Sequence, residues 1–231
     1  MNQRGIIKIS NACILFGKLS IFYLLCHIDY RMQGNHLIIF VKNPVAGKVK
    51  TRLANSIGDK KALEVYMHLL ELTRKVAEGV DCTRHLFYSD KIDSDDWSLG
   101  QFNKHLQSGN DLGEKMKNAV HHILTLGAKR VIIIGSDCPE ITSKIVEEAF
   151  ATLKEKNVCI GPAKDGGYYL LGMRELYSTL FEEKQWSTGS VFEDTLVNLM
   201  KNRLSYACLP PLSDVDTISD LHLVRRLIGR Y

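Results

Sequence analysis

Runs and stripes of apolar residues divide this chain into segments of two kinds. The residues at 131–134 are all β-branched and apolar, which is typical of a strand buried on both faces of a parallel sheet. The run at 36–41 has the same character and predicts a second such strand. Shorter strands are predicted at 85–88, 102–106, 158–161, 168–172 and 205–209.

Helical spacing of apolar residues marks the segments between these strands. One stripe predicts a helix over 63–77 and another predicts a helix over 112–126, with Gly79 and Gly127 as their stop signals. Further helices are predicted at 142–156, 190–201 and 219–229. Strands that alternate with helices predict a three-layer α/β/α sandwich around a mostly parallel, Rossmann-like sheet.

The first thirty or so residues do not fit this pattern. Their apolar run at 12–28 is interrupted by Lys18 and is too short for a membrane span. A secretory signal is the second interpretation, but no small-residue cleavage site follows the run. We favour a third, in which Met32 is the natural start. We therefore expect 1–34 to be an N-terminal extension outside the fold and 35–231 to form a single domain.

Composition narrows the class of protein. The chain has 231 residues, of which 45% are hydrophobic and 24% charged, and this is ordinary for one large globular α/β domain. A net charge of +4 suits a protein that handles anionic small molecules and is too weak and dispersed for nucleic acid. The six cysteines form no CxxC pair and no zinc-type cluster, so we expect reduced thiols in a cytoplasmic protein.

The loop after the first strand carries the densest positive charge. It gathers Lys42, Lys48, Lys50 and Arg52 around Gly47, between a strand end and a helix. Cations and backbone amides at such a corner make a phosphate site, because the helix N-terminus adds its own positive potential. The loop lacks the first glycine and the final Ser or Thr of a Walker A motif. The alternative is a solvated basic turn, and the crowding of charge at one corner favours phosphate.

Asp137 follows the buried strand at 131–134 directly, within the sequence Gly-Ser-Asp-Cys-Pro. In open α/β sheets the ligand crevice lies outside the carboxyl ends of the strands, so this carboxylate is placed to hold a hard cation. The alternative is that Asp137 is only a turn residue, since Asp and Pro favour turns. Taken alone, the two interpretations are evenly balanced.

Two loops contain glycines beside acidic residues. In the first, Asp111 as a helix N-cap with Glu114 three residues later is close to a capping box, which explains both acids structurally. The functional alternative is a loop that passes over a nucleotide base, with Gly109 and Asp111 as contacts.

The second loop, at 165–168, joins two predicted strands. Gly166 and Gly167 serve either a tight hairpin turn or the close approach of backbone to a ligand, with Asp165 and Tyr168 as polar contacts. A last candidate, Asp216, precedes the final predicted helix, where an Asp also serves as a cap.

Four motifs occur in a fixed order, at 42–53, 135–139, 161–170 and 216–217. Together they resemble radical-SAM/selenodomain-associated transferase family 1, which is described as glycosyltransferase-like and is sometimes linked to arsenosugar biosynthesis. That family belongs to the nucleotide-diphospho-sugar transferase (GT-A) superfamily, alongside 2-phospholactate guanylyltransferase and the molybdenum cofactor nucleotidyltransferases. The resemblance runs from about Leu37 to the C-terminus and implies a GT-A-like transferase domain.

The resemblance also implies roles for individual residues. Those matching the superfamily's first nucleotide-binding loop are Lys42, Gly47, Lys48, Lys50 and Arg52. Asp137 and Asp216 resemble its metal-binding aspartates, and Mg²⁺ or Mn²⁺ is the expected cofactor. We expect Asp137 and Lys50 to be catalytic, and Gly109 and Asp111 to complete the nucleotide site. The expected substrate-binding residues are Asp165, Gly166, Gly167 and Tyr168.

Three functions are compatible with these motifs. The leading hypothesis is a metal-dependent, glycosyltransferase-like enzyme that uses a nucleotide-sugar donor and a small-molecule acceptor. The second is a nucleotidyltransferase, in which a phosphate or acid substrate attacks a nucleoside triphosphate and pyrophosphate leaves. The third is a non-catalytic nucleotide-binding partner of another enzyme. In each case we expect a cytoplasmic protein with no nucleic-acid partner and no membrane span.

Overall fold

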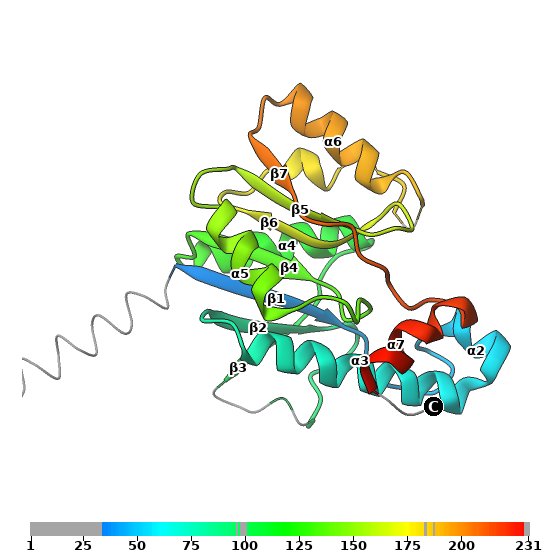
Figure 1. The fold of residues 1–231 in the computed structure, drawn as a ribbon. Helices are drawn as coiled ribbons and strands as arrows, with labels where there is room; N and C mark the ends of the chain where they lie inside the picture. Colours follow the sequence, from blue (N-terminus) through cyan, green and yellow to red (C-terminus); the bar gives the residue numbers. More distant parts are fainter. Residues whose placement is uncertain (1–33, 96, 98–100, 183, 187, 229–231) are drawn as a thin grey trace, which may run out of the picture.

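A seven-stranded sheet with helices on both faces forms the protein in a computed structural model (Figure 1). The structure describes residues 34–95, 97, 101–182, 184–186 and 188–228. The predicted three-layer α/β/α sandwich with a mostly parallel sheet is confirmed. The expected extension lies, apart from Gly34, outside the described residues and stays a prediction.

All of the strands that the sequence predicts are present. They are β1 (Asn35–Val41), β2 (Thr83–Tyr88), β3 (Phe102–Leu106), β4 (Arg130–Ile134), β5 (Val158–Pro162), β6 (Tyr168–Met173) and β7 (Tyr206–Cys208). Their order across the sheet is β3-β2-β1-β4-β6-β5-β7. Every described pairing is parallel except those of β6, which runs antiparallel to both β4 and β5.

The helices also follow the predicted pattern, with two differences. They are α2 (Thr51–Ile57), α3 (Asp59–Glu78), α4 (Leu112–Thr125), α5 (Ser143–Thr152), α6 (Val191–Lys201) and α7 (Leu221–Ile228), with 3₁₀ turns η1 (Ser178–Leu180) and η2 (Ile218–Asp220). The basic loop leads into the short α2 first, because Gly58 at φ 84° interrupts the helical path before α3. The helix predicted to reach 156 ends at Thr152. Within the described residues, no helix has the length and apolarity to cross a membrane.

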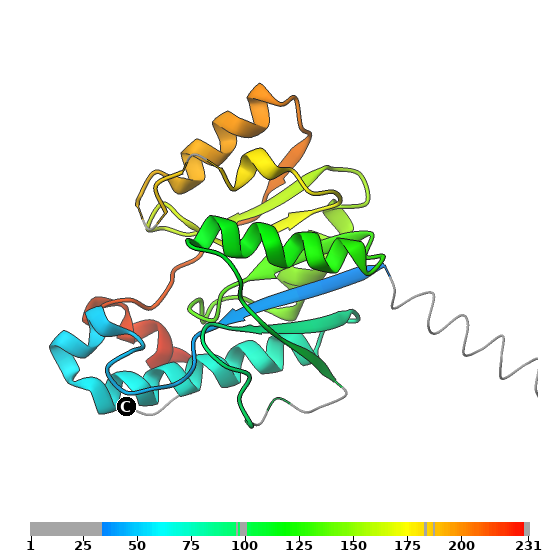
Figure 2. The same ribbon diagram turned by 180° about the vertical axis from the view of Figure 1, so that it is seen from behind.

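Strand β4 is the centre of the packing. Its side chains alternate between two cores: Ile132 and Ile134 pack on the face that α3 and α5 cover, and Val131 and Ile133 pack toward α4. Figure 2 shows α4 lying across that second face. All four side chains are at most 4% exposed. Burial of each side chain stabilises the fold by about 1.5–3 kcal/mol. An apolar residue is therefore favoured at every position of this strand, which is the pattern that predicted it.

The turn between β5 and β6 is the hairpin that the paired glycines allowed. The Ala163 amide donates to the Gly167 carbonyl at 3.0 Å, and Gly166 has φ +92°, a conformation that favours glycine. Asp165 Oδ1 accepts from the Gly167 amide at 2.9 Å, which closes the turn. Because β6 runs back from this hairpin, Tyr168 begins its strand at the edge where β5 ends.

A ladder of histidines crosses three parallel strands on the α4 face. His36 of β1 and His85 of β2 are joined by a ring hydrogen bond of 3.0 Å, and His85 and His105 of β3 by another of 3.1 Å. His122 of α4 packs edge-on against His105, with ring centroids 5.3 Å apart. Burial, with the neighbouring imidazoles, lowers the pKa of His85 to about 3. A neutral imidazole has one donor and one acceptor nitrogen, so neutral His85 donates to one of these neighbours and accepts from the other.

The ladder predicts a pH-dependent stability. The unfolded chain protonates His85 near pH 6.5 and the folded chain only near 3, so the free energy of unfolding should fall as the pH drops between these values. This one group contributes a slope of about 1.4 kcal/mol per pH unit. Urea unfolding at a series of pH values should therefore show a shallower acid slope in His85→Leu than in wild type. The exposed His121, replaced by Gln, should keep the wild-type slope, and equal slopes for all three proteins would contradict the prediction.

Candidate functional site

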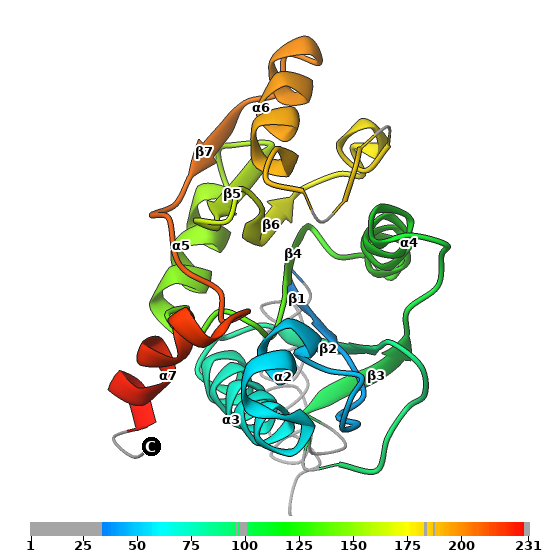
Figure 3. The same ribbon diagram turned by 90° about the vertical axis from the view of Figure 1, so that its right-hand side faces the viewer.

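The predicted site residues gather at the edge where the parallel strands end, which faces the viewer in Figure 3. Four segments meet there: the loop at 42–50 after β1, the loop at 135–142 after β4, the β5–β6 turn and the segment at 210–217. Parallel strands place all of their carboxyl ends on one edge, so segments remote in sequence become neighbours.

Lys50 is the point at which three of these segments are joined. Its backbone is left-handed, at φ 49° and ψ 44°, which costs a residue with a side chain about 1–3 kcal/mol. Its side chain is only 4% exposed, and the ammonium lies 2.6 Å from Asp137 Oδ1 and 3.4 Å from Asp216 Oδ1. The strained loop therefore delivers a buried cation between two carboxylates, one from the end of β4 and one from the final segment.

The two carboxylates have different surroundings. Asp137 is half-exposed, and its backbone carbonyl accepts from the Val215 amide at 3.0 Å, which fastens the final segment to the end of β4. Asp216 Oδ2 also lies 3.5 Å from Arg52 Nη1 at the start of α2. The structure thus brings together Asp137, Asp216, Lys50 and Arg52, which the sequence grouped from separate motifs.

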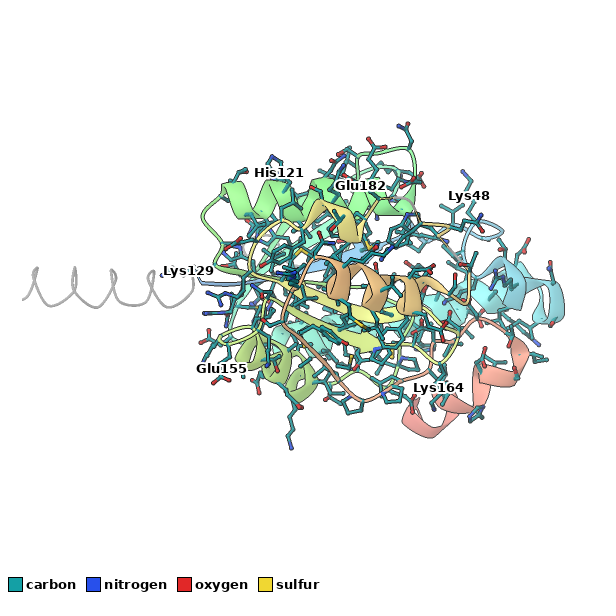
Figure 4. The ribbon with its side chains drawn as sticks, turned by 90° about the horizontal axis from the view of Figure 1, so that it is seen from above. Lys48, His121, Lys129, Glu155, Lys164 and Glu182 are labelled. Carbon is teal, nitrogen blue, oxygen red and sulfur yellow. The ribbon has the colours of Figure 1, made fainter. Side chains whose placement is uncertain are left out.

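The two other lysines of the basic loop face outward. Lys42 and Lys48 are exposed, and the loop turns through a Lys48 amide to Val45 carbonyl hydrogen bond of 3.0 Å. Gly47 has φ +76°, and a Cβ there would approach Asp59 Oδ2 at 3.3 Å. Figure 4 labels Lys48 at the end of the molecule where α2 and α7 lie. These cations are accessible to a ligand, whereas Lys50 is enclosed.

Tyr66 of α3 holds the basic loop in place. Its hydroxyl accepts from the Lys42 amide at 2.8 Å, donates to the Lys42 carbonyl at 3.1 Å and lies 3.3 Å from Ser136 Oγ. Burial raises the pKa of this phenol well above its ordinary value. Sequence reasoning placed Tyr66 only in an apolar helical stripe, because its hydrogen-bond partners lie 24 and 70 residues away.

Asp214 is a second residue that sequence reasoning did not assign to the site. Its Oδ1 is buried and has no hydrogen-bond partner among the described residues. Burial raises the pKa of this carboxyl to about 7, and the negative charges of Asp137 and Asp165 add to that, against the opposing effect of Lys50. The signal in the sequence was the Asp-x-Asp spacing with Asp216, since alternate residues of an extended segment share one side.

Gly109 and Asp111 serve the start of α4. Asp111 accepts from the Glu114 amide at 2.8 Å, while Glu114 reaches back to the Asn110 amide at 2.8 Å, one residue short of a full capping box. Gly109 has φ +140°, and a Cβ there would lie 2.8 Å from the Lys115 nitrogen. Within the described chain neither residue makes a hydrogen bond or ion pair with the loop at 42–50, and their nucleotide contacts stay predictions.

The β5–β6 turn packs against the loop that precedes α6. A Cβ on Gly166 would lie only 2.0 Å from the Gly189 carbonyl oxygen, so the two backbones touch. The Tyr168 hydroxyl is buried without a hydrogen-bond partner in the described structure, and its ring meets Trp186 edge-on at 6.5 Å. Asp165, in the same turn, lies close enough to Asp214 for its negative charge to raise the pKa of that carboxyl. This turn therefore lies near the Lys50 cluster, which consists of Lys50, Asp137, Asp216 and Arg52.

Solved structures of several described transferases are similar to this chain. A protein from Desulfovibrio desulfuricans G20, provisionally described as a nucleotide-diphospho-sugar transferase, is 34% identical, with 84% of this chain and 87% of that chain covered and a TM-score of 0.77. The inositol-1-phosphate CTP transferase from T. maritima is 11% identical, with 86% and 96% covered and a TM-score of 0.54. The CMP:2-keto-3-deoxy-manno-octonic acid synthetase complexed with CTP is also 11% identical, with 85% and 98% covered and a TM-score of 0.56. The last two likenesses show the fold alone.

The chain belongs to the family DUF2064, described as an uncharacterized protein conserved in bacteria, which matches residues 72–188. That match includes Asp137 and the β5–β6 turn. A search of curated proteins gave no match.

The bracing role of Tyr66 is open to a direct test. Tyr66→Phe keeps the ring and removes the hydroxyl, leaving the Lys42 amide without its partner, so we expect a loss of about 1–3 kcal/mol in the free energy of unfolding. Urea unfolding measures it. Tyr206→Phe is the matched control, because that hydroxyl makes no hydrogen bond within the described residues, and it should change stability by less than about 0.5 kcal/mol. Equal stability of the two variants would contradict the role of the Tyr66 hydroxyl in holding the loop.

Proposed function

We propose that this protein is a transferase that takes a nucleotide-diphospho-sugar donor and passes the sugar to a small-molecule acceptor. The observation that carries the proposal is the buried Lys50 ammonium between Asp137 and Asp216, at the strand edge where α/β proteins bind their ligands. The description of the 34% identical relative as a nucleotide-diphospho-sugar transferase supports the same class of donor.

The chemistry of the carboxylates fits a divalent cation held jointly with substrate. Within the described residues, no group of three or more His, Cys, Asp or Glu side chains stands at metal-binding spacing. Mg²⁺ needs no such group, since it is usually bound by one or two carboxylates together with substrate phosphates. Asp137 and Asp216 would hold Mg²⁺ or Mn²⁺ in this way, with the unpartnered Oδ1 of Asp214 beside them. Such a cation would neutralise charge on the leaving diphosphate.

The residues of the chain divide the remaining tasks. Lys48 and Arg52 bind the donor phosphates from the accessible side of the loop, and Lys50 supplies a fixed positive charge beneath them. In the reaction, an acceptor hydroxyl oxygen bonds to the anomeric carbon of the sugar. The bond from that carbon to the phosphate oxygen breaks, and its electron pair leaves with the nucleoside diphosphate. The hydroxyl proton passes to solvent or to a nearby base.

Two narrower assignments belong to the same proposal. The motif order at 42–53, 135–139, 161–170 and 216–217 supports membership of radical-SAM/selenodomain-associated transferase family 1 within this class. The scattered cysteines, of which three of the four in the described chain are buried free thiols, support a cytoplasmic location.

A binding and product assay tests the proposal. Calorimetry of the purified chain with nucleoside triphosphates and nucleotide sugars, with and without Mn²⁺, identifies the donor. Product analysis on each ligand that binds then separates three outcomes: released nucleoside diphosphate supports sugar transfer, released pyrophosphate replaces it with nucleotidyl transfer, and binding without turnover over a broad acceptor panel contradicts both.

Metal dependence should rest on Asp137. Asp137→Asn keeps the size of the side chain and removes its charge, so we expect it to abolish the Mn²⁺-dependent part of nucleotide affinity while the chain stays folded. Calorimetry in the presence and absence of Mn²⁺ measures the effect. Asp81→Asn, an exposed aspartate before β2 at the opposite edge of the sheet, is the matched control and should behave as wild type. If Asp137→Asn retains the full metal dependence, Asp137 is a turn residue.

The accessible cations should contribute separately to affinity. Lys48→Ala and Arg52→Ala each remove one charge-assisted hydrogen bond to phosphate, worth about 1.5–3 kcal/mol, so we expect about ten- to a hundredfold weaker nucleotide binding. Their unfolding midpoints should stay near that of wild type, because both side chains are exposed. Lys60→Ala, at the start of α3, serves as the exposed-lysine control. Unchanged affinity in both loop variants would make the loop a solvated turn.

A further inference from the structure

A surface cavity of about 580 Å³ lies between the segment that contains η1 and helix α6. In Figure 3, α6 and the yellow segment that contains η1 lie on the far side of β6 from α2, and η1 contacts α6. The cavity follows α6 from Ser190 to Asn202. At its Ser190 end it adjoins the β5–β6 turn, because the Phe192 amide donates to the Gly166 carbonyl at 2.9 Å. The cavity therefore begins next to the β5–β6 turn, which contains the predicted substrate-binding residues.

The acidic residues of this cavity already have partners. Glu182, labelled near α4 in Figure 4, pairs with Lys117 of that helix at 3.2 Å. Asp194 Oδ2 accepts from the Ser190 hydroxyl at 3.0 Å. The basic residues lack such partners: within the described chain, no carboxylate oxygen lies within 4.0 Å of the ammonium of Lys184 or Lys201. Because Lys117 neutralises Glu182, the remaining charges of the lining are one negative, Asp194, and two positive, Lys184 and Lys201.

Lys184 is a positioned cation rather than a flexible surface lysine. Its ammonium donates to Thr195 Oγ1, and that hydroxyl, itself 0% exposed, donates to the Val191 carbonyl at 2.7 Å. The ammonium also lies 5.8 Å from the centroid of the Trp186 ring. Burial lowers the pKa of Lys184 to about 8, although the charge of Asp194 opposes this. Half-burial of an ammonium without a carboxylate is costly, and an anion in the cavity would offset that cost.

We propose that this cavity binds an oxyanion group, phosphate or carboxylate, of the acceptor substrate, and that Lys184 contacts it directly. The proposal rests on the proposed function only in taking the occupant to be the acceptor. Trp186 connects the two regions physically, since it contacts both Lys184 and Tyr168 of the substrate turn. The donor phosphates would be held at the Lys50 cluster and the acceptor anion in this cavity, on opposite sides of that turn.

Carbon-13 NMR of the full chain, labelled at lysine Cε, tests the proposal. Lys184 is identified by the resonance missing from Lys184→Met, or from Lys184→Gln if the first variant does not fold. Inorganic phosphate and sodium acetate are titrated separately at constant ionic strength, with chloride as the balancing anion. Lys156, exposed beyond the end of α5, is the matched control and is assigned in the same way.

An oxyanion bound at Lys184 should raise the titration midpoint of this lysine by about one pH unit, which corresponds to tenfold tighter binding to the ammonium form. The Lys156 midpoint should not move. A response to phosphate, to acetate or to both supports the proposal and shows which group the acceptor carries. A Lys184 midpoint that moves no more than that of Lys156 with either anion overturns it.

A second titration separates this inference from the proposed function. The nucleoside diphosphate that binds most tightly in the calorimetric screen is added to saturation before phosphate. If Lys184 still responds, the cavity is distinct from the donor site, as proposed, and loss of the response overturns the acceptor assignment. If no nucleotide binds but Lys184 responds to phosphate, the anion site stands and the proposed function fails.

Discussion

The ion contacts of Lys50 are the constraint on which the candidate site depends. A buried ammonium is costly unless carboxylates lie beside it, and here they come from the end of β4 and from a segment almost eighty residues further along the chain. The contacts also offset the left-handed backbone of Lys50. The loop after β1, the end of β4 and the final segment therefore hold one another in position. Removing either carboxylate would take away part of the attraction that stabilises the strained conformation of this loop.

Tyr66 and the Val215–Asp137 backbone hydrogen bond make that arrangement rigid without adding charge. Tyr66 fixes the start of the loop that carries Lys50, and the backbone hydrogen bond fixes the segment of Asp216 to that of Asp137, so the ammonium and both carboxylates are held in place. A site of this kind suits charge stabilisation, since groups that are already oriented need little reorganisation when negative charge develops. The exposed Lys48 and Arg52 add attraction for the ligand, and Arg52 also pairs with Asp216 at 3.5 Å.

The sequence predicted what local patterns encode. The run at 131–134 is buried on both faces as expected, and each predicted strand exists, because apolar periodicity directly reflects burial. It left the direction of β6 open, since a short apolar strand has the same pattern whichever way it runs and a hairpin was only one of two interpretations of Gly166 and Gly167. Nor did it predict the histidine ladder or the Tyr66 brace. Those depend on strand register and on contacts between residues 20 to 70 positions apart, which no local window contains.

The antiparallel direction of β6 gives the protein a site with two sides. Because β5 ends and β6 begins at the carboxyl edge, the turn at 163–167 is placed beside Asp137 and Asp214, where an ordinary crossover would have carried the chain away. After β6 the chain returns to the carboxyl edge of the sheet before α6 begins. The backbone contact between Gly166 and Gly189 lies at the point of return. Helix α6 leads away from that contact with its polar side facing the returning segment, and the cavity with Lys184 lies between them. One reversed strand thus separates the side that holds Asp137, Asp214 and Asp216 from the side where Lys184 and Lys201 line a cavity together with Glu182 and Asp194.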